Sequence, residues 1–196
     1  MITKEAKAEV YMLPLTYPMN AYYTFDESIS TIAKDKSGNE RHGIIKGASS
    51  VDGISNKALH FDGDDIVELQ DTKKAMICGT FTLEAWIKVQ EHTGKSHIIG
   101  KYDPKEPYTR LTMENGKIVA EFSDIEKTST LTRVDDNKWH HIVMIRNSKG
   151  IVKIYVDGNL QREKEIKAAV SDKIPVTIGA TNLGEGFIGT IDNAAI

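Results

Sequence analysis

The chain has 196 residues, and its 25 lysines and arginines against 28 aspartates and glutamates give a formal net charge of −3 at pH 7. A chain of this length is expected to form one domain with a core of its own. The near-neutral charge, with no run of basic residues, gives no long-range attraction for a phosphate backbone and argues against nucleic acid as a partner.

The cysteine count and the apolar runs exclude further classes. A single cysteine, Cys78, permits neither an internal disulfide nor a multi-cysteine zinc site, and a small buried residue is favoured over a reactive thiol. The longest aliphatic runs, such as residues 142–145, are far shorter than the roughly 20 residues of a membrane-spanning helix. Lys4, Glu5 and Lys7 interrupt any apolar stretch of a secretory signal. The chain is therefore either intracellular or a piece of a longer, exported protein.

Residues 1–20 are predicted to be a lead-in or linker, because Pro14 and Pro18 disfavour a helix there. Residues 21–196 are predicted to form one domain, in which short β-type runs alternate with turn residues. The clearest strand is expected over residues 81–89, where two sets of side chains alternate. One face takes Phe81, Leu83, Ala85 and Ile87, and the other takes Thr82, Glu84, Trp86 and Lys88.

Turn residues indicate how the later strands connect. Strands are expected over residues 110–114, 117–122, 139–146, 151–156, 160–167, 176–180 and 187–191. Asn115-Gly116 favours the positive φ angles of a tight hairpin turn, and residues 157–159 are predicted to join a second hairpin whose last, polar strand lies at a sheet edge. Because hairpins give antiparallel pairs, the predicted fold class is all-β, an antiparallel two-sheet sandwich or jelly roll.

One block carries a family signature. Residues 136–143, which contain Trp139-His140-His141, followed by residues 152–158, resemble the "WHHVA … LYVDG" core of laminin G-like domains in the concanavalin A-like lectin/glucanase superfamily. Agreement extends to residues 23–27 with 35–39, 58–63, 81–87 and 187–192, although Asn193 stands where an acidic residue is more usual. The resemblance spans about residues 22 to 192 and implies a jelly roll with a concave and a convex sheet.

What the resemblance implies for function is broader than what it implies for fold. Similar domains are commonly non-catalytic, sugar-binding modules of secreted bacterial glycosidases, sialidases and surface proteins, while others bind proteins or are glycanases. Fold alone does not choose among these.

A glycanase of this superfamily needs a Glu-x-Asp-x-Glu strand, whose offsets of two keep three carboxylates on one face. The nearest match has Glu121, Asp124 and Glu126, in which Glu121 and Asp124 differ by an odd number of positions. The triplet is therefore absent unless a bulge intervenes, and Asp124 and Glu126 are expected in a solvated turn. No catalytic residue is predicted.

Two adjacent histidines, His140 and His141, suggest metal or acid–base chemistry. Neighbouring residues on a strand point to opposite faces, so the two rings cannot form one site. A structural His141, buried and hydrogen-bonded beside the core, is the favoured interpretation.

A structural calcium ion is the one cofactor considered. Residues 35–39 are rich in oxygen donors on a turn, which suits Ca²⁺. The resemblance places the ion among Asp26, Asp35, Asn39 and Asp192. The alternative is that Asp35 and Asn39 form Asx-type turns without an ion.

Two sets of residues are candidates for a sugar site, which needs an aromatic surface and fixed polar groups. Trp86 shares a strand face with Glu84 and is a candidate platform, unless it packs beneath another segment. Tyr102, Tyr108 and Arg110, expected in a loop over residues 99–110, form a typical recognition set, and the arginine suits a carboxylated sugar. The alternative is a solvated connector.

The leading functional prediction is a non-catalytic carbohydrate-binding module of a larger exported bacterial glycosidase or surface protein, extracellular or at the cell surface. Its partners would be a glycan or polysaccharide and an attached catalytic domain, for which it raises the local substrate concentration. The alternatives are a protein-interaction or adhesion module of laminin G type, and a glycan hydrolase or lyase. An open groove with aromatics favours sugar, whereas a flat apolar patch favours protein.

Overall fold

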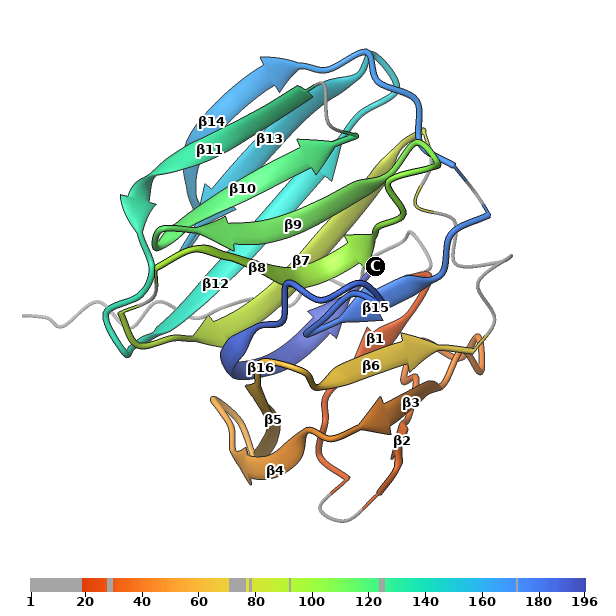
Figure 1. Cartoon of the computed structure of the whole chain (residues 1–196), viewed down its shortest axis with the longest axis vertical. Helices are drawn as coiled ribbons and strands as arrows, with labels where there is room; N and C mark the ends of the chain where they lie inside the picture. Colours follow the sequence, from red (N-terminus) through yellow and green to blue (C-terminus); the bar gives the residue numbers. More distant parts are fainter. Residues whose placement is uncertain are drawn as a thin grey trace, which may run out of the picture.

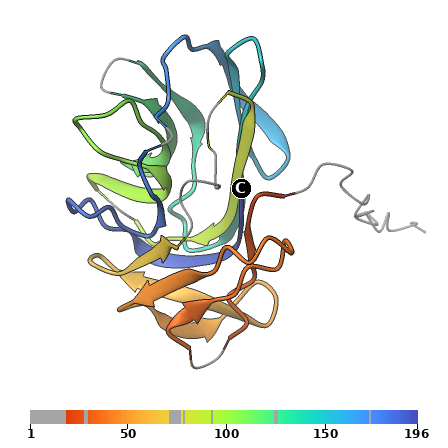
Figure 2. The same cartoon turned by 90° about the vertical axis from the view of Figure 1, so that its right-hand side faces the viewer.

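The computed structural model describes residues 19–27, 30–70, 77, 79–91, 93–123, 126–171 and 173–196. Throughout these residues, strands and turns are the regular structure, and no helix is long and apolar enough to cross a membrane. Two antiparallel sheets stack face to face, as Figure 2 shows from the side. The predicted all-β sandwich is confirmed.

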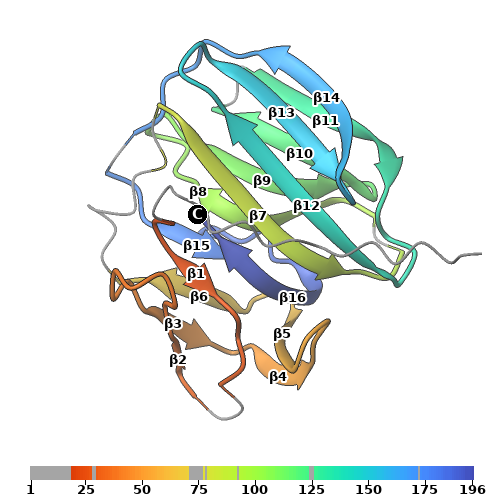
Figure 3. The same ribbon diagram turned by 180° about the vertical axis from the view of Figure 1, so that it is seen from behind.

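Sheet A has the strand order β14-β13-β12-β7-β16-β5-β4, and β1 also pairs with β16. It faces the viewer in Figure 3. Its strands are β1 (Tyr22–Tyr23), β4 (Ser49–Asp52), β5 (Lys57–Asp62), β7 (Phe81–Lys88), β12 (Trp139–Arg146), β13 (Ile151–Val156), β14 (Asn159–Glu165) and β16 (Ile188–Ala195).

Sheet B has the order β11-β10-β9-β8-β15-β6-β3-β2, and its strands β8 to β11 lie in front in Figure 1. Its strands are β2 (Ile32–Ala33), β3 (Gly43–Lys46), β6 (Ile66–Leu69), β8 (Lys95–Lys101), β9 (Thr109–Glu114), β10 (Lys117–Phe122), β11 (Glu126–Arg133) and β15 (Val176–Ile178).

The core fills the space between the two sheets, and β7 shows how the sequence builds it. Its residues alternate strictly between buried and half-buried, so the predicted apolar face is the inner one. Phe81 meets Phe122 of β10 in sheet B with ring centroids 6.3 Å apart. The alternation that predicted this strand therefore also fixes which of its side chains face outward.

Both predicted hairpins are present. Asn115 and Gly116 have φ angles of 50° and 77°, the two positive values of a two-residue turn that matches strand twist. The second turn is shorter than predicted, because Asn159 already begins β14. Strand β14 lies at the edge of sheet A, which confirms the predicted polar edge strand.

Two expected boundaries change. The loop predicted over residues 99–110 is confined to residues 102–108, since β8 runs to Lys101 and β9 begins at Thr109. Glu126 is the first residue of β11 rather than part of a turn. Strands β2, β3, β4, β6, β8 and β11 are not predicted from their sequence patterns, and except for β8 they are short or largely exposed.

The two ends of the described domain lie side by side. The backbone N–H groups of Asn20 and Ala21 donate to the carbonyl of Ile196, at 2.6 and 3.3 Å. Most of the predicted lead-in (residues 1–18), Cys78 and Asp124 lie outside the described residues. The boundary between a lead-in over 1–20 and a domain over 21–196 stays a prediction.

Candidate functional site

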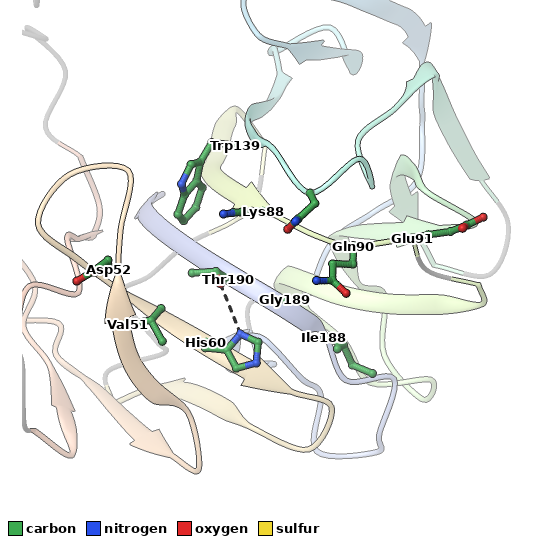
Figure 4. A pocket seen from close by; sticks show the side chains of 11 residues that line it. Val51, Asp52, His60, Lys88, Gln90, Glu91, Trp139, Ile188, Gly189 and Thr190 are labelled. Atoms are coloured by element: carbon green, nitrogen blue, oxygen red, sulfur yellow. Dashed lines mark hydrogen bonds between the residues drawn. The ribbon is translucent and has the colours of Figure 1, made fainter.

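A groove of about 560 Å³ lies on the outer face of sheet A, and we call it the Trp139 groove. It runs across β12, β7, β16 and β5 and is walled on one side by the β4–β5 hairpin (Figure 4). Its lining residues are Val51, Asp52, His60, Lys88, Gln90, Glu91, Asn137, Trp139, Ile188, Gly189 and Thr190.

The antiparallel register sets four of these side chains in one row. Trp139 stands opposite Lys88, Lys88 opposite Thr190, and Thr190 opposite His60. All four alternate with buried core residues, so they point outward, and all four are partly exposed. Three strand spacings of about 4.8 Å make the row about 14 Å long. The result is an open groove with an aromatic ring at one end and polar groups along its floor.

Hydrogen bonding leaves much of this polar floor available. Among these four side chains one hydrogen bond is formed, between His60 Nδ1 and Thr190 Oγ1 at 3.5 Å, drawn as the dashed line in Figure 4. No hydrogen bond or ion pair within the described part of the chain engages Lys88 Nζ. On the groove wall, Asp52 pairs with Lys57 at 2.7 Å. The groove therefore presents donors that are not already used by the fold.

The predicted platform Trp86 lies on the same outer face, two residues before Lys88 on β7. His141 of β12 stacks on it, with ring centroids 5.0 Å apart and an interplanar angle of 25°. Glu84 Oε2 lies 3.8 Å from His141 Nε2. One face of the Trp86 ring is thus covered by the protein itself.

The predicted core position of His141 is wrong. Ile142 and Met144 of β12 are fully buried, so the other set, which includes His141, faces outward and is partly exposed. His140 points away from His141, as predicted, and its ring nitrogens contact Asp157 and Asp136 at 2.8 and 3.0 Å. Burial alone would lower the pKa of His140, but the hydrogen bonds to these two carboxylates outweigh it and raise the pKa.

A second, apolar groove of about 580 Å³ lies on the same face at its other end. Val143, Ile145, Ala195 and Ile196 supply much of its apolar lining. The outer face of sheet A therefore carries one polar groove and one apolar groove, which are the two kinds of surface that separate sugar binding from protein binding.

The other predicted set, Tyr102, Tyr108 and Arg110, does come together, but on the outer face of sheet B. Leu111 and Met113 of β9 face the core, so Arg110, which alternates with them, faces outward. The Arg110 guanidinium carbon lies 3.8 Å from the centroid of Tyr102, and the rings of Tyr102 and Tyr108 meet edge to face at 4.8 Å.

This sheet B cluster is largely closed, although Tyr102 is partly exposed. Arg110 is fully buried and Tyr108 nearly so. Arg110 Nε donates to Glu121 Oε2 at 2.8 Å, and its Nη1 pairs with Glu185 from the segment after β15. The arginine charge is already matched by two carboxylates. Trp86 and Glu84 lie on the opposite face of the sandwich, so the two predicted sets cannot contact one small ligand together.

Residues 61–196 match the Laminin_G_3 family, described as the concanavalin A-like lectin/glucanases superfamily. The chain belongs to this superfamily. The resemblance carried by the Trp139-His140-His141 block is thereby confirmed. No curated protein sequence matches the chain significantly.

Solved structures share the fold of this lectin-like domain. Domain 4 of AbnA, a GH43 extracellular arabinanase from Geobacillus stearothermophilus solved with arabinotriose, aligns with a TM-score of 0.74 and 19% identity over 90% of each chain. The binding domain of Paraclostridial Mosquitocidal Protein 1 has a TM-score of 0.74 and 18% identity over 91% of this chain, and that of botulinum neurotoxin serotype D has 0.66 and 19% over 90%. The chain spans about half the length of these two toxin domains, 48% in each.

The superfamily also contains glucanases, which makes the carboxylates on sheet B relevant. Glu121 is buried and held by Arg110 and by Lys95 Nζ, at 2.8 Å each. Glu126 accepts a hydrogen bond from the backbone of Lys167 at 3.2 Å. Of the three residues that resemble the glucanase triplet, Glu121 and Glu126 are described. Glu121 forms ion pairs with the protein itself and does not lie free in a cleft.

In this lectin-like domain the predicted calcium ligands fall into two pairs. Asp35 accepts from the backbone N–H groups of Tyr22, Ser37 and Arg41, at 2.8 to 3.0 Å, and from Ser37 Oγ at 2.8 Å. Although burial alone would raise it, these hydrogen bonds lower the pKa of Asp35. Asn39 Nδ2 donates to the carbonyl of Met19 at 2.7 Å. The Ser37 N–H contact gives Asp35 the Asx-type turn of the alternative, whereas Asn39 donates to a backbone carbonyl instead.

The other pair is Asp26 and Asp192. Asp192 is fully buried, and its Oδ2 accepts from the backbone of Ile54 and Ser55 at 3.0 and 3.4 Å. Burial, together with the negative charge of Asp26, raises the pKa of Asp192 despite these bonds. Within the described ranges, Asp62, Asp64 and Asp65 are the one group of three acidic side chains whose carboxylate oxygens lie within 4.8 Å of one another. The predicted ligands Asp26, Asp35 and Asp192 do not form such a group.

The groove residues Trp139, Lys88, Thr190 and His60 are not among the predicted site residues. Each lies on a different strand, and no local pattern joins them. The sequence contains two indications of this groove. One is the polar face of the strand over residues 81–89, which includes Lys88, and the other is Trp139 at the start of the predicted strand over residues 139–146. Only the strand register brings them together.

Proposed function

We propose that this chain is a non-catalytic carbohydrate-binding module and that its glycan lies in the Trp139 groove. The observation that carries the proposal is the row of outward side chains from Trp139 to His60 across four strands. An aromatic ring offers an apolar face to the C–H face of a pyranose, and the polar groups beside it bind hydroxyls.

The comparisons support this proposal at the level of fold. One structural relative is a single domain of an extracellular arabinanase, solved with a bound arabinose oligosaccharide, and it matches this chain over nearly its full length. We propose by analogy that this chain is likewise part of a larger exported protein, such as a glycosidase or a surface protein. Holding the polymer close to an attached catalytic domain would raise the local substrate concentration without chemistry in the module itself.

Trp86 and Glu84 belong to this proposal as an extension of the groove. They lie on β7 on the same face as Lys88, beside the row rather than at its end, so a glycan that also extends along β7 reaches them. The set Tyr102, Tyr108 and Arg110 stays a sequence prediction. The burial of Tyr108 and Arg110 and the ion pairs of Arg110 speak against direct contact of these two residues with a ligand, whereas Tyr102 is partly exposed.

Calcium also stays a prediction. The paired carboxylates Asp26 and Asp192 repel each other, and a cation beside them would relieve that repulsion. Asp35, whose two oxygens already accept four hydrogen bonds, is the weakest of the proposed ligands. A thermal melt with Ca²⁺ and with a chelator tests the site: we expect a higher melting temperature with Ca²⁺, and an unchanged one removes the ion from the proposal.

A second function, a protein-interaction or adhesion module, is favoured by the apolar groove on the same face. Its lining by Val143, Ile145 and Ile196 suits apolar side chains of a partner rather than sugar hydroxyls. Two structural relatives are binding domains of toxins. A glycan hydrolase or lyase is the third candidate, and turnover of a polysaccharide panel by the chain would establish it.

The decisive experiment is a glycan array followed by calorimetry with the best oligosaccharide. Trp139→Ala removes the aromatic end of the row, and we expect at least a tenfold loss of affinity. Val143→Ala, in the apolar groove, is the matched control and should leave affinity unchanged. If Val143→Ala reduces binding and Trp139→Ala does not, the ligand lies in the apolar groove; if no glycan binds, the proposed function is wrong.

A further inference from the structure

We infer that the Trp139 groove selects glycans that carry a carboxylate, and that Lys88 is the residue that determines this preference. The inference rests on the proposed function and adds to it a substrate class. It begins from the position of Lys88, which stands between Trp139 and Thr190 in the row.

Lys88 differs from other lysines of sheet A in having no partner. Lys57 pairs with Asp52 at 2.7 Å, and Lys153 pairs with Glu163 at 3.2 Å. Lys88 forms no ion pair or hydrogen bond through Nζ within the described residues, although it is only partly exposed and lines the groove. A cation held in a groove without a counter-charge is a site at which an anion gains more than it does at an open surface.

The acidic residues of the groove do not neutralise this charge. Asp52 is already paired with Lys57. Glu91 is exposed and lies at the far end of the groove from Trp139 (Figure 4). Between them, the groove offers the amide groups of Gln90 and Asn137 and the ring of His60. The middle of the groove is therefore positive, and its other polar groups are able to donate hydrogen bonds.

The neighbouring tryptophan makes the ligand a sugar acid rather than a free anion. Trp139 and Lys88 are cross-strand partners, so their side chains begin about 5 Å apart on the same face. A pyranose that rests on the indole ring places a ring carboxylate within reach of a flexible ammonium group, which binds as a point charge. Neutral sugars gain the stacking contact but leave the ammonium group unpaired.

The test compares each acidic ligand with its own uncharged form. Oligosaccharides of galacturonic, glucuronic, mannuronic and N-acetylneuraminic acid are measured by calorimetry beside their carboxyl-reduced counterparts, together with neutral arabinan, galactan and xylan oligosaccharides. We expect at least one acidic ligand to bind about tenfold more tightly than its reduced form, with an affinity that falls as salt is added.

Variants assign the preference to one residue. Lys88→Gln should remove the tenfold difference while leaving the affinity for the reduced ligand unchanged, and Lys88→Arg should retain most of it. Lys153→Gln, which removes a paired lysine elsewhere on the same face, is the control and should have no effect. Circular dichroism confirms that each variant is folded.

The outcomes separate the two proposals. If neutral glycans bind and acidic ones do not, or if Lys88→Gln keeps the preference, the inference about Lys88 is overturned and the carbohydrate module stands. If no glycan of either kind binds, both fail.

Discussion

The two outer faces of the sandwich use similar residues to opposite ends. On sheet A, Trp139 and Lys88 are partly exposed, and Lys88 has no partner among the described residues. On sheet B, Arg110 lies against Tyr102 but is fully buried and paired with Glu121 and Glu185. Each face thus combines a cation with an aromatic ring. What separates them is whether the chain itself supplies the counter-charge.

The difference shows how residues typical of ligand recognition, here Tyr102, Tyr108 and Arg110, can serve the stability of the fold instead. Glu185 reaches Arg110 from a segment 75 residues further along the chain, and Lys95 joins the same carboxylates at 2.8 Å to Glu121 and 3.8 Å to Glu185. A buried ion network of this kind fixes its own geometry and leaves little charge for a ligand. Lys88, which lies beside Trp139 and has no partner among the described residues, keeps its charge available to a ligand. We therefore expect changes on sheet B to act on stability and changes on sheet A to act on binding.

The largest effect is expected from Arg110→Met. It breaks a buried ion pair and leaves Glu121 with Lys95 as its remaining ion-pair partner, which costs about 3–5 kcal/mol of unfolding free energy. Glycan affinity, measured by calorimetry at a temperature where the variant is folded, should not change. Urea unfolding gives the stability.

A second variant and a contradicting outcome complete this test. If Arg110→Met does not fold, Glu185→Gln offers a milder change, because the Glu185 side chain is 32% exposed and its loss should cost only about 1 kcal/mol. A variant of either residue that stays fully stable but loses glycan binding would move the binding site to sheet B.

The second prediction concerns pH, because sheet B buries a histidine on its outer face. Burial, helped by the positive charges of Arg110 and Lys95, lowers the pKa of His97 from 6.5 to about 3, although its hydrogen bond to Thr177 acts in the other direction. Between these values the unfolded chain binds a proton that the folded protein does not. Stability from a neutral His97 is therefore complete above pH 6.5 and is lost as the pH falls towards 3.

At pH 5 the expected loss of unfolding free energy is about 2 kcal/mol. It follows from about 1.4 kcal/mol for each pH unit below the histidine pKa of the unfolded chain. Urea unfolding at pH 7.5 and pH 5 measures it. His97→Gln should remove most of this difference, whereas His60→Gln, on the partly exposed face of sheet A, should not. Equal pH dependence in the wild type and His97→Gln would show that the histidine is protonated in the folded state.

How far the sequence predicts this molecule depends on whether the cause is local. Alternation within residues 81–88 predicts both the strand and its inner face, and Asn115-Gly116 predicts its hairpin, because neighbouring residues determine each. His141 was assigned to the wrong face because β12 is apolar on both faces. Ile142 and Met144 compete with Val143 and Ile145, and only packing against sheet B decides between them.

The site is less predictable than the strands for the same reason. His60 and Thr190 are 130 residues apart in the chain, and the row that contains them exists only once four strands are in register. The burial of Arg110 depends likewise on a distant segment. The residue types predict a cation beside an aromatic ring on each outer face. The pairing of distant strands determines that the pair on sheet A is exposed and the pair on sheet B is largely buried.

The smallest effect is expected within sheet A and concerns Trp86. Its ring stacks on His141, so Trp86→Ala should cost about 1 kcal/mol of stability for the lost aromatic contact. Because Trp86 lies beside the row and not in it, affinity for an oligosaccharide that spans only the row should stay the same. A longer ligand that reaches Trp86 should bind two- to threefold more weakly, and calorimetry with a series of increasing chain length measures the difference.

This last comparison locates the centre of the site. Dependence on chain length places Trp86 outside the part of the site that the shortest ligand fills, because a residue beside the row contributes only when the ligand reaches it. If Trp86→Ala instead weakens the shortest ligand as much as Trp139→Ala does, the centre lies at the stacked Trp86 and His141 pair. The open face would then bind sugar at the platform that the strand pattern of residues 82–88 predicts, and Lys88 would contact its edge.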